Sequence, residues 1–465
     1  MTHKKKLIFL LGVAVATSGC SLTPAPQTPP LIETIGALPT YTSLPPTSEP
    51  VALQGWWQAI GGTPMDALVA ELLKQSLVLQ EVRLQVIQAN ERAAQATGQR
   101  RPAIGYAIDR TRSRAPDFGG DFSWSNNYSA GINTNFDTDI WGQLRATERA
   151  AVLGAQAAEY SYLANEQLEI SRLVRNWVSA IALYQQLELA NDTARTFQIT
   201  YDLTDERYRV GSQTSSASDV LIARQNLEFA LIDIPELERQ LASQFLVIDE
   251  QLARMPGTTA ADFKIADFPE GLSVPTLDRP IDLLANRPDV AAAELRYRAA
   301  LEDIGAAKAN LYPALTLSAA ITLQDDTPSG FSWDDYIASL SSALTGPIFQ
   351  GGRLRSQVRI ERAEAEELST AFARATHSAV IDVETALVSI EGLTRQLERS
   401  KAAVDTARQS NDLVLYRYRQ GLGSLLSVLE AQRSLNTTRQ SLIINKQALV
   451  NAQIDLFVSL GGDWI

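Results

Sequence analysis

The 465-residue chain contains few of the residues on which enzyme and metal chemistry depend. It has one cysteine and two histidines. With Cys20 as the only cysteine, the chain has no internal disulfide, so its stability has to come from packing or assembly. It also lacks a metal-spaced cluster, a phosphate-cradling glycine loop and a nucleophile motif. These absences argue against an enzyme and predict neither a metal nor a bound cofactor.

Basic charge and long apolar runs are also scarce. Lys and Arg number 41 against 53 Asp and Glu, and the formal net charge is −12. An acidic chain of this kind is a poor candidate for binding nucleic acid. After residue 19 no stretch approaches the roughly 20 consecutive apolar residues that a membrane-spanning helix needs. Any membrane crossing by this chain is therefore expected to use strands.

Residues 1–19 have the pattern of an export signal. Three lysines precede a short apolar run from Leu7 to Ala16, and small residues lead to Cys20. This arrangement resembles the lipobox of bacterial lipoproteins, which implies that residues 1–19 are a lipoprotein signal peptide and that Cys20 is acylated after cleavage. Ser21 in the next position fits passage to the outer membrane. Thr17 stands where Leu is usual, which leaves open cleavage by the ordinary signal peptidase with an unmodified thiol.

The segment after the signal is rich in proline. Eight prolines lie between Ser21 and Pro50. Proline fixes φ and removes a backbone donor, so the segment is expected to stay extended. We interpret residues 20–50 as a lipidated tether between the membrane and the folded body.

Most of the remaining chain is duplicated. The sequence Arg-Tyr-Arg-Val-Gly at 207–211 returns 210 residues later as Arg-Tyr-Arg-Gln-Gly at 417–421. Further on, the offset falls to 208, so the first copy has two extra residues after its glycine. We predict repeat 1 over 51–280 (strand hairpin about 102–138, long helices about 142–254, connection 255–280) and repeat 2 over 281–465 (strand hairpin about 313–347, long helices about 354–460).

Two long stretches without proline predict long helices. Ala146–Tyr208 and Leu354–Arg419 each contain a single glycine, and their apolar residues recur with a spacing close to seven. At 1.5 Å per residue each stretch would form a helix of about 95 Å, which has to pack side by side with others as a coiled coil. Gly211 and Gly421 are expected to supply left-handed C-caps, and serines the next N-caps, so each glycine marks a helical hairpin. Pro235 is expected to kink the first returning helix.

Alternating apolar and polar residues precede each long helix. The alternation covers Ile104–Ile108 and Ala130–Phe136 in the first copy and Leu315–Leu323 in the second. Strands of about ten residues with one apolar and one polar face are required by a transmembrane β-barrel. Both hairpin tips contain Phe-Ser-Trp, which suits a membrane interface. A soluble sheet with one wet face is the alternative.

Four strands cannot close a barrel within lipid, because the open edges would leave backbone groups unpaired. Several copies must therefore contribute their strands to one barrel. Two copies would give eight strands with a packed interior, and three would give twelve with room for a lumen. The polar faces, rich in Gly, Ser, Thr and Asn, favour the larger barrel. The expected fold class is mainly α with a transmembrane β-barrel.

Several motifs then carry a family resemblance. They are Asn286–Glu294, Asp303–Pro313, Asp139–Arg145, Pro347–Leu354 and Leu429–Arg433. Together with the lipobox and the duplication they strongly resemble the TolC/OprM/NodT family of outer-membrane efflux factors, over essentially the whole chain. The resemblance implies a homotrimer with one twelve-stranded barrel and an α-helical tunnel across the periplasm. It also implies docking to a periplasmic adaptor (membrane fusion) protein and an inner-membrane RND-type pump.

The resemblance assigns a periplasmic gate to the helix after the second hairpin. Leu426, Glu430 and Arg433 match its residues, and Asp219 from the first hairpin is a further candidate. Three copies of one carboxylate around an axis would attract cations, and an apolar ring closes a pore by dewetting. The family more often has Asp where Glu430 stands. The alternative is that Glu430 and Arg433 form an exposed i, i+3 pair.

The same resemblance places the adaptor contact at the hairpin tips. The residues concerned are Gly211, Gly421, Arg207, Tyr208, Arg417 and Tyr418. The alternative is that the glycines are only helix caps, and both readings are compatible.

The expected function is that of an outer-membrane channel component of a tripartite efflux pump. It would give small molecules, such as drugs and toxic organics, a passive exit from periplasm to exterior, with Cys20 anchoring it in outer-membrane lipid. A type I protein secretion duct and a periplasmic coiled-coil scaffold lipoprotein without a pore are the alternatives.

Overall fold

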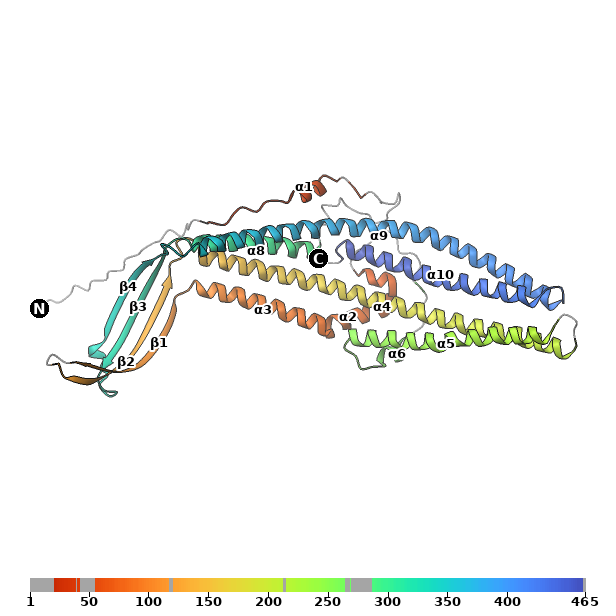
Figure 1. The fold of residues 1–465 in the computed structure, drawn as a ribbon, viewed down its shortest axis with the longest axis horizontal. Helices are drawn as coiled ribbons and strands as arrows, with labels where there is room; N and C mark the ends of the chain where they lie inside the picture. Colours follow the sequence, from red (N-terminus) through yellow and green to blue (C-terminus); the bar gives the residue numbers. More distant parts are fainter. Residues whose placement is uncertain are drawn as a thin grey trace. The chain divides into compact units, whose positions relative to one another are not determined.

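The computed structural model combines long helices with one antiparallel sheet (Figure 1). The signal peptide 1–19 and Cys20 lie outside the residues that the structure describes, as does most of the 255–280 connection. The described residues are 21–38, 40–41, 55–116, 120–211, 215–263, 268 and 287–462. The expectation of a mainly helical fold with a small set of strands is confirmed.

The chain divides into two compact units, each of which takes segments from both repeats. The strand unit comprises the described part of Met1–Thr28, with Ile87–Ala158 and Ala293–Phe372. The helical unit comprises the described parts of Pro29–Val86, Glu159–Ala292 and Ala373–Ile465. The repeat boundaries at 51–280 and 281–465 stay a prediction about the sequence.

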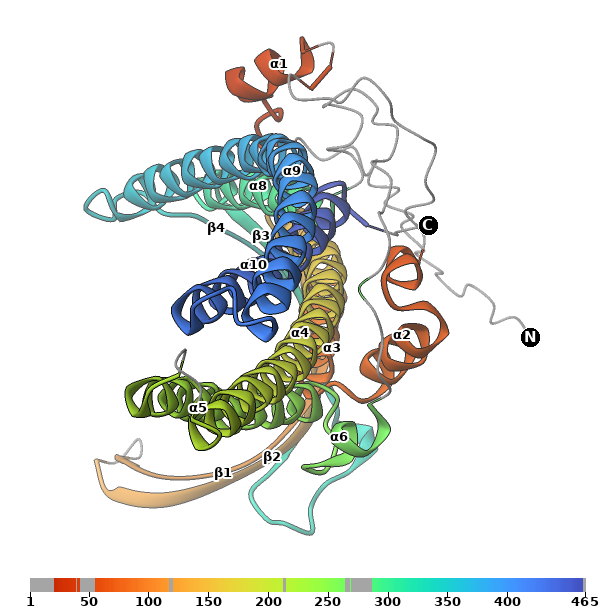
Figure 2. The ribbon, with the colours of Figure 1, turned by 90° about the vertical axis from the view of Figure 1, so that its right-hand side faces the viewer.

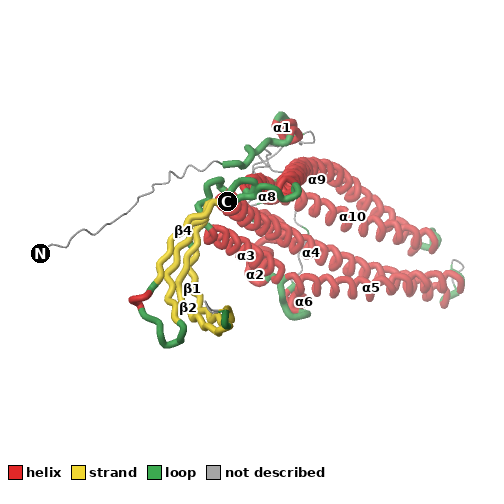
Figure 3. Tube along the Cα trace, turned by 60° about the vertical axis from the view of Figure 1, so that its left-hand side comes forward, coloured by secondary structure: helices red, strands yellow, loops and turns green. Residues whose placement is uncertain are grey.

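A four-stranded sheet forms one part of the strand unit (Figure 3). Its strands are β1 (Ala103–Pro116), β2 (Phe122–Asp137), β3 (Ala314–Asp325) and β4 (Ile337–Thr345), with the short 3₁₀ helix η1 (Trp333–Asp335) before β4. All neighbours are antiparallel in the order β1-β2-β3-β4, so β1 and β4 each keep one edge without a partner strand among the described residues.

The two faces of the sheet differ in chemistry. Directly opposed residues share a face, and Ile132 stands opposite both Tyr106 and Ile321. The apolar face is open, since Tyr106 is 81% exposed and Leu340 of β4 is 84% exposed. On the other face Ser318 donates to Asn135 Oδ1 at 2.7 Å, one of several polar pairs there. The alternation expected from the sequence therefore produces a sheet that is apolar on one side and polar on the other.

Helices continue the chain from the ends of these strands. The strand unit holds most of α3 (Leu77–Gln99) and α8 (Pro288–Ala309), and the first turns of α4 (Gln143–Arg209) and α9 (Arg353–Arg419). Tyr297, Leu301 and Ile304 of α8 pack against Ala365 of α9. Asp139 caps α4 by accepting from the Leu144 and Arg145 amides at 2.8 and 3.0 Å.

The helical unit contains two long helical hairpins (Figure 2). The first joins α4 to α5 (Ala217–Gln251), and the second joins α9 to α10 (Leu425–Ser459). The duplication is visible in their lengths, because α4 and α9 both have 67 residues and α5 and α10 both have 35. The helix α5 continues through Pro235. The short helix α6 (Thr258–Asp262) follows α5.

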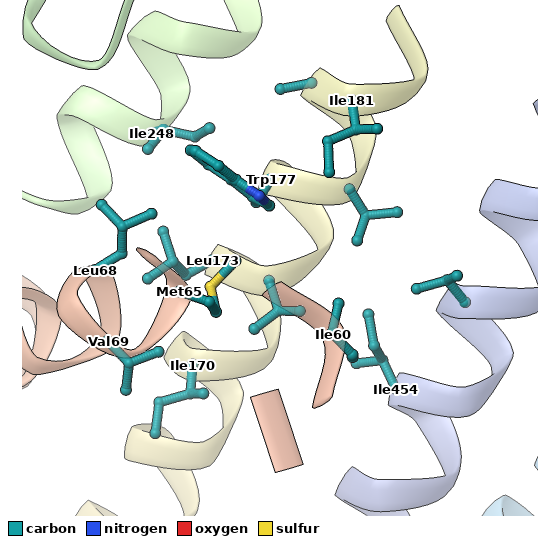
Figure 4. Close-up of a cluster of buried hydrophobic side chains, with 14 of the residues drawn as sticks. Ile60, Met65, Leu68, Val69, Ile170, Leu173, Trp177, Ile181, Ile248 and Ile454 are labelled. Carbon is teal, nitrogen blue, oxygen red and sulfur yellow. The ribbon is translucent and has the colours of Figure 1, made fainter. Parts of the chain in front are cut away.

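The core of the helical unit is built around α2 (Trp56–Gln75) (Figure 4). A left-handed Gly62 breaks this helix at φ 60°, and Met65 beyond the break is fully buried. Figure 4 shows Met65 close to Leu173 of α4. At the start of α2, Trp56 stacks on Phe457 of α10 with 5.8 Å between ring centroids. The tryptophan thus holds α2 in the core of the unit.

The proline-rich segment departs from the extended conformation expected for residues 20–50. Pro30–Gly36 forms the helix α1, so the expectation is wrong there. Pro30 occupies the first turn, where a missing N–H removes no intrahelical bond and the fixed φ suits a helix.

In the part of the chain that the structure describes, no helix combines the length and apolarity that crossing a membrane requires.

Candidate functional site

The tips of the two helical hairpins carry most of the residues expected to be functional. Gly211 and Gly421 have φ of 73° and 78°, so both expected left-handed caps are confirmed. The Gly421 amide donates to the Tyr418 carbonyl at 2.9 Å, and the Gly211 amide donates to the Tyr208 carbonyl at 3.1 Å. Each tip therefore reverses through a backbone conformation that side chains disfavour.

Serines start both returning helices, but the two caps differ. Ser216 and Asp219 form a reciprocal capping box at the start of α5, in which the Asp219 carboxylate accepts from the Ser216 amide at 2.9 Å. In the second hairpin Ser424 accepts from the Ser427 amide at 3.2 Å, without an acid. Asp219, expected as a gate residue, thus has a local task in its own hairpin.

The two tips meet through Tyr418. This side chain is 1% exposed, and its hydroxyl lies 3.0 Å from Thr204 Oγ1 on the first hairpin. The Arg207 guanidinium lies over the Tyr418 ring, 4.5 Å from its centroid, and donates to the Arg419 carbonyl at 2.8 Å. Arg207 Nη1 is buried without a hydrogen-bond partner. Arg207 of the first motif copy and Tyr418 of the second thus join the two hairpins.

The other expected tip residues do not take part in this contact. Tyr208, the counterpart of Tyr418, is 47% exposed, and Arg417 is exposed as well. Both glycines are exposed too. The structure therefore brings together two of the six expected docking residues and leaves the other four at the surface.

The expected gate residues lie on the first turns of α10. Leu426 is 61% exposed and Glu430 is exposed, whereas the neighbouring Leu425 and Leu429 are buried against the first hairpin. Leu426 and Glu430 are four residues apart and so share one face of the helix. That face presents an apolar side chain beside a carboxylate.

Arg433 follows a different course. Its guanidinium donates to Asn226 Oδ1 on α5 at 3.1 and 2.5 Å. No ion pair joins Arg433 to Glu430 among the described residues, so the alternative of an i, i+3 pair does not hold. Asn226 is 5% exposed and belongs to the same interface between hairpins.

No sequence motif predicts the hydrogen bonds that cross this interface. Buried Gln432 donates to Thr200 Oγ1 at 2.9 Å, beside the Asn226–Arg433 contact. The positions of Asn226 and Gln432 are the one signal that could have predicted their burial, because these residues interrupt the apolar stripes of α5 and α10.

A second site holds the N-terminal segment in the strand unit. Thr23 Oγ1 donates to Glu302 on α8 at 2.7 Å, and the Lys308 ammonium donates to the Leu22 carbonyl at 3.1 Å. Arg149 also donates to Glu302 at 2.7 Å. A Cβ on Gly305 would lie 3.2 Å from the Thr23 Cα and 2.5 Å from its Oγ1. The segment just after Cys20 thus lies so close to α8 that a side chain at position 305 would crowd Thr23.

Metal chemistry finds no support in the described side chains. No group of three or more His, Cys, Asp or Glu residues among them is placed to hold a metal ion.

Comparisons with known proteins agree on one family. The family described as outer membrane efflux protein matches residues 68–253 and 280–462. The pyoverdine export outer membrane protein OpmQ of Pseudomonas aeruginosa is 29% identical over 99% of this chain and 97% of its own length. The toluene efflux pump outer membrane protein TtgF of Pseudomonas putida is 28% identical over 98% and 96%. The CmeC outer membrane channel of Campylobacter jejuni has the same fold, with a TM-score of 0.84 at 20% identity over 95% of each chain.

Proposed function

Because this chain belongs to the outer membrane efflux protein family and serves as an outer-membrane efflux channel, we propose that three copies form one conduit for small molecules. In this proposal their strands close a twelve-stranded barrel, and their helices form a tunnel through the periplasm. The relatives are named for pyoverdine export and toluene efflux, so small organic molecules are the proposed cargo class.

One observation carries the proposal: the sheet is amphipathic and open. Its apolar face is exposed, and within the part of the chain that the structure describes the outer edges of β1 and β4 have no partner strand. Unpaired backbone groups within lipid cost several kcal/mol each, so a membrane-inserted sheet needs neighbours at both edges. A second and third copy would supply them, β4 of one copy pairing with β1 of the next. The polar faces, with Asn133, Asn135 and Ser318, would then line the lumen.

The hairpin tips are proposed to face the periplasmic partners. Arg207, Tyr208, Gly211, Arg417, Tyr418 and Gly421 form the proposed contact with an adaptor protein, through which an inner-membrane RND-type pump delivers cargo. Leu426 and Glu430 are proposed to narrow the tunnel entrance, because three copies of this apolar and acidic face would form two rings. Arg433 would support them by fixing α10 to α5, and Asp219 would do so by capping α5.

The lipid anchor is proposed on Cys20. The described contacts of Leu22 and Thr23 with α8 support this proposal, since they would keep an acyl group two residues away beside the strand unit. Replacing Cys20 by Ser should abolish acylation but leave a fraction in the outer membrane if the barrel is the main anchor. Full release to the periplasm would count against membrane insertion of the strands.

Disulfide cross-linking tests barrel closure. A cysteine at Tyr106 in β1, combined with cysteines at successive outward positions of β4 around Leu340, should give covalent trimers in the outer membrane. The control pair Ile132→Cys and Ile321→Cys, which are directly opposed on β2 and β3, should cross-link within one chain only.

Conductance tests the channel itself. The purified lipidated protein should migrate as a heat-modifiable trimer and conduct ions in a planar bilayer. Absence of both trimers and conductance would overturn the proposal and favour the alternative of a periplasmic scaffold without a pore.

A further inference from the structure

Three arginines of β1 form a row on the apolar face of the sheet, each beside an aromatic ring of β2. The guanidinium carbon of Arg110 lies 5.4 Å from the Tyr128 ring centroid, and that of Arg112 lies 4.7 Å from the Trp124 centroid. Arg114 lies over Phe122 at 5.4 Å and over Trp124 at 5.9 Å. Because residues two apart share a strand face, the three side chains lie on the same side. We call them the arginine row.

The row begins where the apolar surface ends. Along β3 the apolar face runs from Leu315 to Leu323, about 27 Å at 3.4 Å per residue, which is close to the roughly 25 Å apolar band of outer-membrane proteins. The register places Leu323 level with Ile108 of β1, through Ala130 of β2. The next outward position on β1 is Arg110.

The row also lies at one defined end of the strands. β1 follows α3 and β2 leads to α4, so the helices attach at the end of the sheet opposite to the β1–β2 turn. If the helices extend into the periplasm, the arginine row lies at the outer surface of the membrane. This inference therefore rests on the proposed function, in which the sheet spans the membrane.

The positive charge of the row is not neutralised by the described residues. None of the three arginines forms an ion pair with a described carboxylate. Asp325, level with Tyr128 on β3, instead accepts from the Thr327 amide and hydroxyl at 2.8 Å each. Asp109 points to the opposite face of β1. The aromatic rings hold the guanidinium groups by cation–π contact and leave their N–H edges free to donate.

We propose that the arginine row binds the phosphate groups of lipopolysaccharide in the outer leaflet of the outer membrane. A guanidinium donates two parallel hydrogen bonds to a phosphate, and three of them spaced along one strand match a headgroup with more than one phosphate. The adjoining apolar face, with Ile108 and Leu323, would contact the acyl chains of the same lipid. Phe122, Trp124 and Tyr128 lie beside the row on β2, and Tyr128, level with Arg110, adjoins the apolar face. Aromatic side chains prefer the membrane interface.

The test compares two lipids on the full-length trimer in detergent. Lipopolysaccharide and its enzymatically dephosphorylated form are titrated, and binding is followed by native mass spectrometry. The wild type should bind the phosphorylated lipid more tightly. Replacing all three arginines (R110Q/R112Q/R114Q) should weaken its binding on the order of 100-fold, since each basic residue near a charged membrane surface contributes roughly five-fold. Arg112→Lys should retain most of the affinity lost in Arg112→Gln.

A matched control removes three arginines from the helical unit. Arg195, Arg224 and Arg239 are 73%, 63% and 65% exposed, and R195Q/R224Q/R239Q should leave lipid binding unchanged. A β1 triple variant within two-fold of the wild type would overturn the proposal, as would equal binding of both lipids.

Two further outcomes separate the proposal from its premise. If the β1 triple variant loses its trimers without any lipid present, the row contacts the neighbouring copy, through Asp334 or Asp335 before β4, and lipid recognition is rejected. Conductance of the wild type in a planar bilayer tests the membrane insertion of the sheet independently. A conducting wild type that does not distinguish the two lipids rejects the lipid site alone.

Discussion

The two hairpin tips have almost the same sequence and opposite surroundings. Tyr418 is 1% exposed and Tyr208, its counterpart, 47%. On the returning helices Leu429 is 1% exposed, whereas Leu221 at the matching position is 67% exposed. Helix lengths and the left-handed glycine caps are the same in both copies, so these features of the local fold do not explain the difference. The first hairpin covers this face of the second, while the same face of the first has no neighbour among the described residues.

This difference fits the proposed ring of three copies. In a trimer the uncovered face of the first hairpin would receive the second hairpin of the next copy, with Arg417 over Tyr208 as Arg207 lies over Tyr418. The match would be incomplete, because Val414 is the counterpart of Thr204 in the second copy. Valine has no hydroxyl, so it could not bond the Tyr208 hydroxyl as Thr204 bonds that of Tyr418. We therefore expect the contact within a chain to be stronger than the contact between chains, and the latter to open first.

The largest expected effect comes from Tyr418→Ala. It removes a buried ring, its hydroxyl bond and the surface on which Arg207 lies, and should destabilise the tips by about 3–5 kcal/mol. Hydrogen exchange of tip amides in the detergent-solubilised trimer would measure this. Tyr208→Ala should affect exchange much less, and Tyr416→Ala, at a side chain 62% exposed, serves as the control. Equal effects at Tyr208 and Tyr418 would show that the two interfaces are equivalent.

Substitution of the tip glycines should have the next largest effect. Gly211→Ala and Gly421→Ala each place a side chain in the left-handed region at a cost of about 1–2 kcal/mol. The two backbone costs are alike, so unequal loss of cross-linking to the adaptor would reveal which tip docks. Gly154→Ala, within α4 and with open space around it, should be harmless. Loss of trimers would instead make the glycine concerned a folding element.

The contrast between the copies extends to the helices before the strands. On α8 the pKa of Asp303 is raised to about 6 by burial and by Glu361, Glu364 and Glu302, whereas both acids of α3 are exposed. The folded state thus favours the protonated carboxyl, and its contribution to stability is lost as the pH rises from about 4 to about 6.

Asp303→Asn should therefore raise the melting temperature at pH 7.5 and leave it unchanged at pH 4. The control Glu91→Gln on α3 should change it at neither pH. A melting temperature lowered at pH 7.5 would mean that charged Asp303 has a favourable partner in the assembled protein.

Replacing the residues at the helix caps should give a smaller difference in stability between the copies. Asp219→Ala removes the acceptor of the Ser216 amide and should cost about 1 kcal/mol, whereas Ser427→Ala leaves the Ser424 cap intact and should cost less. Exchange of the first α5 amides would measure the loss. If Asp219 only caps α5, Asp219→Ala should leave the ion conductance of the channel unchanged. A raised conductance would support the assignment of Asp219 to the gate.

The smallest expected effect is on the closed channel. Leu426→Ala and Glu430→Ala should each raise small-ion conductance, because one widens an apolar ring and the other removes a ring of charge. Ser218→Ala, at the position of the first hairpin that matches Leu426, is the control. Unchanged conductance in both variants would reject the proposed entrance.

Local signals predicted much of the fold. Alternation located the strands, and the glycine–serine pairs located both hairpin turns, since each depends on a few adjacent residues. The helix at Pro30–Gly36 was not predicted, because eight prolines in one segment suggest an extended chain. A single proline in the first turn, however, is compatible with a helix. The alanine-rich helix α8 was hidden because small residues mark the buried face of a helix weakly.

The site was less predictable than the fold. The repeated Arg-Tyr-Arg-x-Gly motif cannot show that one tyrosine is buried and the other exposed, because that depends on which neighbour each hairpin has. The Arg433–Asn226 bond joins residues 207 positions apart, and no local pattern marks it. The arginine row was not predicted either, because the pairing of its side chains with the rings of β2 depends on the register of the two strands.

The seat of Thr23 against α8 also sets an order of events during biogenesis. The bond from Thr23 to Glu302 spans 279 residues, so the first residues to reach the periplasm cannot take their final place until most of the chain has followed. Contacts between such distant residues form slowly, because a long loop has to close first. The strand unit is therefore completed late in translocation, with Gly305 as the position at which the two ends of that loop meet.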